Sequence, residues 1–444
     1  MTSRAPTLES MVQLARDGLL EEFVERAHGL EPADLADVLA SLDEAERIGV
    51  VQVLPPELSS QALIEMPVEA HAEDTLAALA PEQAAEIVEE MDDDDAADLL
   101  GELDPEDQER ILSEVENRSD VDELLRYDEE SAGGLMTTAV VAVEAAATAS
   151  EALHSIRHQA EEVDFYQIYV VDDARHLVGV LPLKDLVVSS PRRPVRDFME
   201  PADIVVPPDL DQEEVARLMA RYNLPAVPVV DAQGRLLGQV TFDDVTDVVE
   251  AETTEDILQF GGTSADEVIA AGWRDAVRSR LPWLYINLVT AFVAGAVVYA
   301  YQGIVERVVM LAAWMPIIAG MGGNAGTQAL AVTVRRLALG LIAPGQGVRI
   351  IGKEVLVGTI NGLANGVVVA AAAMLLHQGP MMGLVVFLAM TGNLLVAGFA
   401  GAFIPLLLER FRVDPAIASS IFVTTFTDVC GFSLLLGLAG LLLL

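Results

Sequence analysis

The sequence predicts a multidomain membrane protein with an all-α N-terminal superhelical domain, a tandem pair of small α+β domains, and an all-α transmembrane domain of five helices. Three observations predict this order. The 444 residues divide sharply by charge, two repeats of different period occupy the acidic part, and long apolar stretches fill the rest. A chain of this length is also expected to hold more than one domain.

The charge division separates a soluble part from a membrane part. The chain carries 69 acidic and 26 basic residues, but residues 281–444 hold only 5 of the acids and 7 of the bases. Nucleic acid is not expected as a partner of the acidic part, because phosphate contacts require clustered basic charge. A surface this acidic either keeps the part soluble or binds cations.

Residues 1–130 are predicted to form an acidic helical domain built from repeats. Four prolines recur at intervals of 24 or 25 residues, and each is followed by apolar residues at helical spacing; they are Pro32, Pro56, Pro81 and Pro105. Proline is favoured in the first turn of a helix. A period in the mid-twenties, with two short helices per unit, predicts a superhelical stack.

A second repeat predicts two related α+β domains, over residues 131–195 and 196–248. Three residues of the first copy recur 59 positions later in the second: Asp172, Gly179 and Asp185 correspond to Asp231, Gly238 and Asp244. Each copy reads as helix, apolar strand, turn, strand and helix.

A connecting segment over residues 249–280 leads towards the membrane and begins in an acidic helix. From Asp243 to Asp256 the chain has seven acids and no base. Acids on one helix repel one another, and bound Mg²⁺ or Ca²⁺ would relieve that repulsion, because both prefer oxygen ligands. The alternative is a solvated acidic helix. The run from Asp92 to Asp95, with Asp98, allows the same two interpretations, since helix starts favour acids.

Five apolar stretches in residues 281–444 are each long enough to cross the hydrocarbon core: 282–302, 308–334, 351–376, 381–408 and 416–443. Basic residues cluster before the first stretch and after the second and fourth, whereas the opposite side holds only Arg307. The positive-inside rule therefore puts the N-terminal domains in the cytoplasm and the C-terminus outside a cytoplasmic (inner) membrane.

Asp428 is the only carboxylate in the interior of the predicted spans. A charge at mid-membrane depth is costly unless it faces a polar cavity or a partner. No Lys, Arg or His lies in the apolar part of any span, so we interpret Asp428 as part of a cation path. One acid is few for a divalent ion. A symmetric dimer with two Asp428 side chains on its axis would provide a site for a cation that keeps most of its water.

Small and amide residues gather in the second span after Pro316, which would bend the helix. They are Gly320, Gly322, Gly323, Asn324, Gly326, Thr327 and Gln328. Such residues allow close packing or unwinding, so that backbone carbonyls can line a wet path. The side chains of Asn287, Asn361 and Asn393, in other spans, are interpreted as interhelical hydrogen-bonding groups.

The domain order and several motifs resemble the MgtE family of magnesium channels, and the α+β pair resembles CBS domains. The motifs are Gly-Gly-Leu-Met-Thr (133–137), Pro316 with Gly322-Gly-Asn-Ala-Gly-Thr-Gln328, Asp414-Pro-Ala, and Thr424-Thr-Phe-Thr-Asp-Val-Cys-Gly431. The resemblance implies a homodimer in the lipid bilayer, with a Mg²⁺ pore on the dimer axis. Its selectivity residue falls on Asp428, with Asn324 and Thr424 as further pore residues.

The resemblance also implies a cytosolic sensor, in which Mg²⁺ bridges acids of the soluble domains and closes the gate. The sensor positions carried over are Asp94, Asp98, Asp211, Glu213, Asp244, Asp247, Glu252, Glu255, Asp256 and Asp414. Gln61 and Asn223 stand where the family can carry an acid. The number of regulatory sites in this chain is therefore left open.

In CBS domains an Asp after the second strand, with Ser or Thr three residues earlier, can hold a nucleotide ribose. Thr241 and Asp244 fit this pattern in the second copy, whereas the first copy has Pro182 before Asp185. ATP or another adenine nucleotide is thus an implied ligand of the second copy. The alternative is that Thr241 caps a helix.

Enzymatic activity is not expected, because no nucleophile arrangement or phosphate-binding loop is present. The sequence therefore predicts a Mg²⁺-selective channel for magnesium uptake that cytosolic Mg²⁺ closes. One alternative is a membrane-anchored nucleotide or cation sensor without transport, but an anchor has no use for Asp428. A second is an anion channel, which would need basic groups at its constriction.

Overall fold

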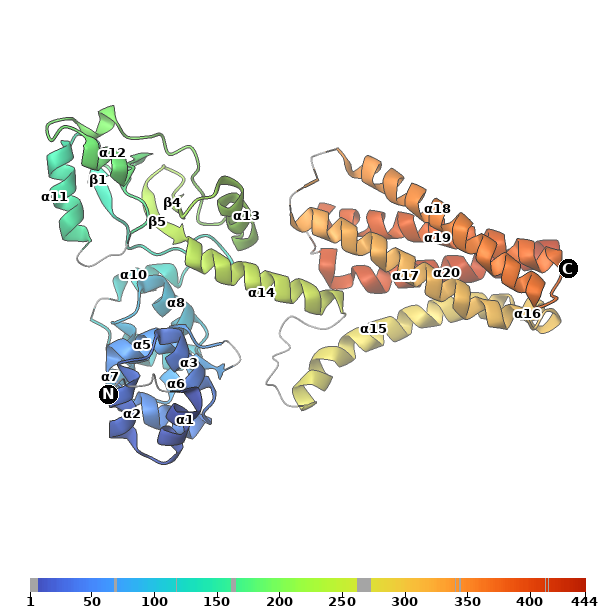
Figure 1. Cartoon of the computed structure of the whole chain (residues 1–444), viewed down its shortest axis with the longest axis horizontal. Coiled ribbons are helices and arrows are strands. Elements are labelled where there is room, and N and C mark those ends of the chain that lie inside the picture. Colours follow the sequence, from blue (N-terminus) through green and yellow to red (C-terminus); the bar gives the residue numbers. More distant parts are fainter. Residues whose placement is uncertain are drawn as a thin grey trace. The chain divides into compact units, whose positions relative to one another are not determined.

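The computed structural model describes residues 7–67, 70–116, 118–160, 165–261, 273–339, 341–342, 345–411, 413 and 415–444. The chain divides into two compact units, Met1–Glu250 and Ala251–Leu444, and each is described by itself. Figure 1 labels most of the helices and strands of both units.

The first unit begins with a stack of short helices. Within the described residues these are α1 (Leu8–Arg16), α2 (Leu20–Ala27), α3 (Pro32–Ala40), α4 (Glu44–Val51), α5 (Pro56–Ile64), α6 (Ala72–Ala77), α7 (Pro81–Val88), α8 (Asp93–Gly101), α9 (Pro105–Leu112) and α10 (Ser119–Leu124). Each of the four periodic prolines starts a helix, as predicted. The helices that begin with proline pack on one another in order, α3 on α5, α5 on α7 and α7 on α9.

Stacking explains how such short helices are stable. A pair of helices of eight or nine residues cannot bury its apolar face alone, and neighbouring pairs must cover it. Leu39, Leu63, Ile87 and Ile111 come from successive repeats, and Phe23 lies in α2 before the first of them. All five are almost fully buried in one continuous core. The all-α superhelical part of the predicted fold is confirmed.

The α+β part follows the 59-residue repeat. Its first copy contains β1 (Ala142–Glu144), α11 (Ala149–Gln159), β2 (Tyr169–Val171), β3 (Leu177–Val180) and α12 (Leu183–Val188), followed by a short 3₁₀ turn, Val195–Asp197. Its second copy contains α13 (Gln212–Tyr222), β4 (Ala226–Val230), β5 (Leu236–Thr241) and α14 (Phe242–Phe260). In the first sheet β1 pairs parallel with β2 and β2 antiparallel with β3, and β4 pairs antiparallel with β5.

The repeated aspartates close the two hairpins in the same way. Asp172 Oδ1 accepts the backbone N–H groups of Ala174 and His176 at 2.9 Å. Asp231 Oδ1 accepts those of the corresponding Gln233 and Arg235, also at 2.9 Å. The two turns then bond to each other, with Leu177 N donating to Gly234 O and Leu236 N to Arg175 O. The sequence repeat is therefore a structural repeat.

The second unit is helical. It contains α15 (Trp273–Ala300), α16 (Gln302–Arg307), α17 (Leu311–Ala338), α18 (Gly347–Leu375), α19 (Pro380–Arg410) and α20 (Pro415–Leu442). Among the described residues, four helices are long and apolar enough to cross a membrane, and they lie in α15, α18, α19 and α20. The remaining predicted span, the second one (308–334), corresponds to α17, which has 28 residues but carries the glycine and amide run. Its crossing of the membrane stays a prediction.

Glycines bring the backbones of α18 and α19 into direct contact. A Cβ atom at Gly358 would lie 2.3 Å from Leu394 O, and one at Gly398 would lie 2.3 Å from Glu354 O. Small residues are the usual means of helix packing in lipid, where apolar side chains gain little by leaving their surroundings. α17 packs along α19 and α20, but it hardly contacts α18.

Candidate functional site

In the second unit, the glycine run of α17 packs against α20. A Cβ atom at Gly326 would lie 2.5 Å from Val423 Cγ1, and one at Gly323 would lie 3.9 Å from Thr424 Cγ2. Gly326 therefore allows the predicted close packing, whereas a Cβ atom at Gly320 would meet nothing within 4 Å. They bring the segment that precedes Asp428 directly against α17.

Asn393 of α19 joins α17 and α20 at this contact. Its Nδ2 atom donates to Ile318 O at 2.8 Å, and the side chain is fully buried. A Cβ atom at Gly322 would lie 2.2 Å from Asn393 Nδ2, and one at Gly431 would lie 2.8 Å from it. The interhelical role predicted for Asn393 is confirmed. Its Oδ1 atom finds no hydrogen-bond partner among the residues described.

The same interpretation is wrong for Asn287 and Asn361. Both residues are exposed, and in the described part of the chain neither side chain makes an interhelical hydrogen bond. An isolated Asn in an apolar helix does not reveal which face it occupies. Asn393 differs because two glycines, Gly322 and Gly431, leave space for its carboxamide group.

Asp428 lies half-buried on α20 and makes no hydrogen bond or ion pair with any described residue. Thr424 is exposed one turn earlier on the same face, and its hydroxyl donates to Ser420 O at 2.8 Å. Asn324 is exposed on α17, next to the Gly323 that faces Thr424. The structure thus brings the Thr424 turn of α20 beside the Asn324 segment of α17.

Glu354 is a buried carboxylate that the sequence interpretation missed. It is 6% exposed, and its Oε1 atom lies 3.3 Å from the Nζ atom of Lys353. Asp428 is therefore not the only acid held within the helices of this unit. A signal was present, because Glu354 precedes Gly358 and Gly362 at helical spacing and so shares the face that packs on α19.

In the first unit, the acidic run at the start of α8 divides into residues with different roles. Asp93 accepts hydrogen bonds from the hydroxyls of Thr137 and Thr138, the former at 2.6 Å, and from Thr138 N at 3.0 Å. It therefore ties α8 to the end of the Gly-Gly-Leu-Met-Thr motif. Sequence reasoning did not separate Asp93 from its neighbours.

Asp94 is buried, with 8% exposure, and its Oδ1 atom has no partner within the described ranges. Burial, and then the negative charge of Asp244, raise its pKa to about 9. Burial and Asp244 also raise the pKa of Asp95 to about 7. Asp95 belongs to the predicted acidic run but was not among the sensor positions that the family resemblance implied. For Asp98, burial and Glu129 raise the pKa to about 7. We call Asp94, Asp95, Asp98, Glu129 and Asp244 the acidic cluster.

Asp98 and Glu129 line a cavity of about 390 Å³ together with Asp128. Two glycines of the Gly-Gly-Leu-Met-Thr motif pack directly against the segment that contains Asp128 and Glu129. A Cβ atom at Gly133 would lie 2.6 Å from Tyr127 Cγ, and one at Gly134 would lie 2.5 Å from Asp128 O. The motif thus explains why the acidic loop can lie beside α8, although the sequence did not single out Glu129.

Asp244 joins the cluster from the first turn of α14. Burial raises its pKa, although a hydrogen bond from Thr241 opposes the shift. The Thr241 hydroxyl donates to Asp244 Oδ2 at 2.6 Å, and Thr241 N donates to the same atom at 3.3 Å. The two residues predicted as a nucleotide site therefore contact each other. Asp247 follows one turn later, and burial together with Glu250 raises its pKa.

Asp211 and Glu213 are bonded locally. Asp211 caps α13 by accepting Glu213 N at 2.9 Å, and Glu213 pairs with Arg217 at 2.6 Å. Asn223 ends the same helix in the left-handed region, with φ 52°, a conformation that Asn tolerates better than most residues. Gln61 is exposed on α5.

The four remaining predicted sensor residues are not part of the acidic cluster. Glu252 and Glu255 are half-buried on α14. The side chain of Asp256 and the whole of Asp414 lie outside the described residues.

Three families match separate parts of the chain. Residues 315–438 match the MgtE family, described as divalent cation transporters, and residues 30–130 match the MgtE intracellular N domain. Residues 132–191 and 195–251 each match the CBS domain.

Two curated relatives extend over almost the whole chain. The magnesium transporter MgtE of Thermus thermophilus is 37% identical, with 99% of this chain and 98% of that protein covered. The magnesium transporter MgtE of Bacillus subtilis is 32% identical, with 97% and 96% covered. A crystal structure of the cytosolic domain of the Mg²⁺ channel MgtE in complex with ATP is 38% identical, with a TM-score of 0.51, and covers 54% of this chain and 99% of that one.

Proposed function

This chain belongs to the MgtE family of magnesium transporters, and we propose that Mg²⁺ crosses the membrane past Asp428 while the acidic cluster regulates its passage. The chain transports Mg²⁺ as its relatives do, and the alternative of an anchored sensor without transport is set aside. The relatives are named as transporters and not as enzymes, which agrees with the expectation from the sequence.

The observation that carries the pore proposal is the carboxylate of Asp428, which has no partner among the described residues and is the one charged group in α20. A charge in that setting is stable when it faces water or a cation. Thr424, one turn away, and Asn324, on the neighbouring helix, add oxygen atoms that can bind the water shell of Mg²⁺. One chain supplies a single carboxylate, so the proposal includes a homodimer in which two copies of Asp428 face one path.

The regulatory part of the proposal rests on the acidic cluster. Carboxylate oxygens are the ligands that Mg²⁺ prefers, and Asp94 offers a buried oxygen with no protein partner in the described part of the chain. After burial, the negative charge of Asp244 contributes to the raised pKa values of Asp94, Asp95 and Asp98, so these acids lie close together. A bound cation would replace their repulsion with attraction, so Mg²⁺ would favour the compact arrangement of this unit.

The proposed regulatory set extends along α14 to Asp247, Glu252, Glu255 and Asp256, and then to Asp414. Because α14 runs without a break from Phe242 to Phe260, cation binding at Asp244 can affect the segment that leads to the transmembrane helices. Asp211 and Glu213 belong to this set only if they release Glu213 N and Arg217.

We also propose that ATP or another adenine nucleotide binds at Thr241 and Asp244. A relative's cytosolic domain is described in complex with ATP. The hydrogen bond from Thr241 to Asp244 holds the carboxylate in place at the start of α14. The N-terminal domains are placed in the cytoplasm and the C-terminus outside, as the basic residues indicate.

The test is Mg²⁺ influx into liposomes that contain the purified protein. Asp428→Asn removes the charge but keeps the shape of the side chain, and we expect it to abolish influx. Cys430→Ser, two residues along the same helix, is the matched control and should keep wild-type influx. Normal influx through Asp428→Asn would exclude Asp428 from the path.

A further inference from the structure

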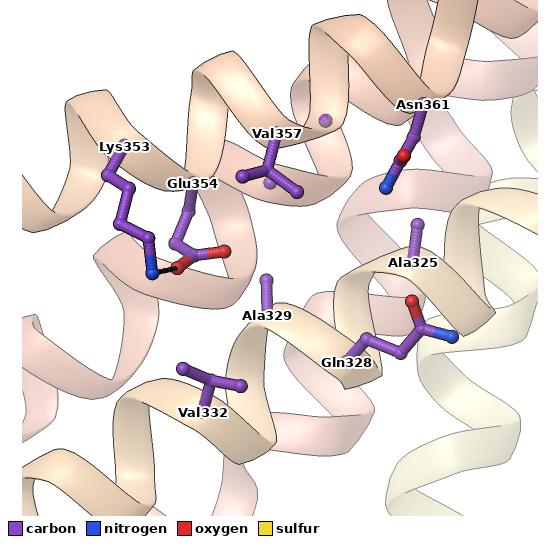
Figure 2. A pocket seen from close by; sticks show the side chains of 10 residues that line it. Ala325, Gln328, Ala329, Val332, Lys353, Glu354, Val357 and Asn361 are labelled. Carbon is purple, nitrogen blue, oxygen red and sulfur yellow. Dashed lines mark ion pairs between the residues drawn. The ribbon is translucent and has the colours of Figure 1, made fainter. Parts of the chain in front are cut away.

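The second unit contains a cavity that the proposed cation path does not use. It measures about 280 Å³ and lies between α17 and α18, with Gly398 of α19 among its lining residues (Figure 2). The two helices on either side pack on α19 and hardly touch each other. Backbone contacts at Gly358 and Gly398 hold α18 against α19. Closing the gap by moving α18 towards α17 would therefore have to separate these α18–α19 contacts.

The lining of this cavity is amphipathic. Figure 2 shows Ala325, Ala329 and Gln328 on α17 facing Val357 and Asn361 on α18 across the gap. Val332 and Val357 are 43% and 40% exposed, so the cavity has an open apolar edge. In a bilayer, such an edge contacts acyl chains, while the two carboxamide groups offer donors and acceptors to a polar ligand.

The charges exclude a free divalent cation as the preferred occupant. Glu354 is neutralised by Lys353 at 3.3 Å, so the cavity itself carries no net charge. Arg349 lies one turn before Lys353 on α18, and Arg336 lies one turn after Val332 on α17. Neither arginine forms an ion pair with a described residue. The mouth of the cavity is therefore positive.

We propose that this cavity binds the headgroup of an anionic phospholipid from the leaflet at the basic end of the unit. Lys353 and Arg349 would bind its phosphate, and Gln328 and Asn361 would hydrogen-bond its hydroxyl groups. Its acyl chains would lie along Val332 and Val357. Basic pockets between transmembrane helices recognise such headgroups. The lipid supplies the contact between α17 and α18 that the two helices do not make themselves.

A lipid in this position links transport to membrane composition. α17 carries Asn324 and the glycine run that packs beside Thr424. A headgroup that steadies α17 against α18 would favour one arrangement of that run. We therefore expect Mg²⁺ influx to rise when phosphatidylglycerol is added to phosphatidylcholine liposomes.

The direct test measures the phosphatidylglycerol retained by the full-length protein, using native mass spectrometry, together with Mg²⁺ influx. Lys353→Gln and Arg349→Gln should each weaken lipid retention about fivefold, as expected for one basic residue near an anionic surface. Arg349→Gln leaves the Lys353–Glu354 pair intact, so it tests the site even if an unpaired Glu354 prevents folding. Arg410→Gln, at the same end on α19 and outside the cavity lining, is the control and should retain lipid as the wild type does.

Equal retention by Lys353→Gln, Arg349→Gln and the control would overturn the proposal. So would inorganic phosphate that, added to phosphatidylcholine liposomes, raised influx as much as phosphatidylglycerol, because the cavity would then recognise phosphate and not lipid. Lipid retention does not depend on transport. A failure of Asp428 as the pore residue would therefore leave this test unchanged.

Discussion

The acidic cluster of the first unit and the Asp428 segment of the second both hold carboxyl groups away from full solvent. They differ in how many other acids lie beside them. Five acids crowd together in the cluster, and burial and mutual repulsion raise the pKa values of Asp94, Asp95 and Asp98. Asp428 has no described acid beside it, and its neighbours on the same face are threonines. One site offers many carboxylates to a cation and the other offers one per chain.

This difference suits two different tasks. A cation held by several carboxylates loses much of its water and stays long enough to change a conformation. A cation that must pass through a pore has to bind strongly enough to enter and weakly enough to leave. A single carboxylate per chain, reached through the water shell, meets the second requirement. We therefore expect changes at the two sites to separate regulation from conduction.

The largest expected effect comes from disturbing the helix packing near the proposed path while Asp428 itself is kept. Gly322→Ala would place a methyl group 2.2 Å from Asn393 Nδ2, which is wedged between two helices. We expect a loss of about 3 kcal/mol in stability from overpacking, with reduced Mg²⁺ influx. Thermal unfolding of the detergent-purified protein measures this. Gly320→Ala is the control, because a Cβ atom there meets nothing within 4 Å. Equal melting temperatures for the two variants would contradict the contact.

The second prediction concerns the first unit and distinguishes Asp93, which has a structural role, from the acids of the cluster, which are proposed to be regulatory. Asp93→Ala removes the acceptor for Thr137 and Thr138, and we expect it to destabilise the protein by about 2 kcal/mol. The response of transport to internal Mg²⁺ should remain. Asp34→Ala, an exposed acid in the first turn of α3, should change neither property. A lost Mg²⁺ response in Asp93→Ala would make Asp93 a ligand as well.

The third prediction tests whether regulation can be changed while conduction is kept. Asp94→Asn replaces a buried carboxyl group of the cluster, which a bound cation would ionise, with a neutral amide. We expect it to leave maximal influx unchanged and to raise the internal Mg²⁺ concentration that half-closes the channel about tenfold, or about 1.4 kcal/mol. Influx at a series of internal Mg²⁺ concentrations measures this, with Asp34→Asn as control. Closure at the wild-type concentration would remove Asp94 from the sensor.

The smallest expected effect is a dependence of closure on pH. The pKa values of Asp95 and Asp98 are raised to about 7, so without Mg²⁺ these acids favour the compact unit at low pH, and that contribution is lost as pH rises through about 7. Protons and Mg²⁺ both favour the compact unit, so protonation of these acids supports closure. We therefore expect about threefold less internal Mg²⁺ to close the channel at pH 6.5 than at pH 7.5. The dependence should shrink in Asp98→Asn, and equal concentrations at both pH values would show that protonation of these acids does not favour closure.

Much of the fold could be predicted from the sequence because its signals are local or periodic. Proline placed the starts of α3, α5, α7 and α9, since its fixed φ suits the first turn of a helix. The 59-residue repeat predicted two equivalent hairpins, because an Asp that closes a turn acts within four residues of itself.

The candidate site was less predictable because its contacts join distant parts of the chain. Asp93 and Asp94 are neighbours in one acidic run, yet only Asp93 meets Thr137 and Thr138, 44 and 45 residues away. Glu354 was visible as an acid, but its burial depends on how glycines seat α18 on α19. Asn393 was predicted correctly and Asn361 was not, although the two are alike in sequence context.

The helical stack of the first unit is built from equivalent repeats, so its length can be changed one repeat at a time. Pro56 occupies the same place in its helix as Pro32 does in the preceding repeat. Excising residues 32–55 would therefore join Glu31 to an equivalent helix start and shorten the stack by one step, leaving α8 and its aspartates in their own repeat. Insertion of a copied repeat would lengthen it in the same way. The reach of this domain is thus an adjustable property, set by the number of modules rather than by the chemistry of any one of them.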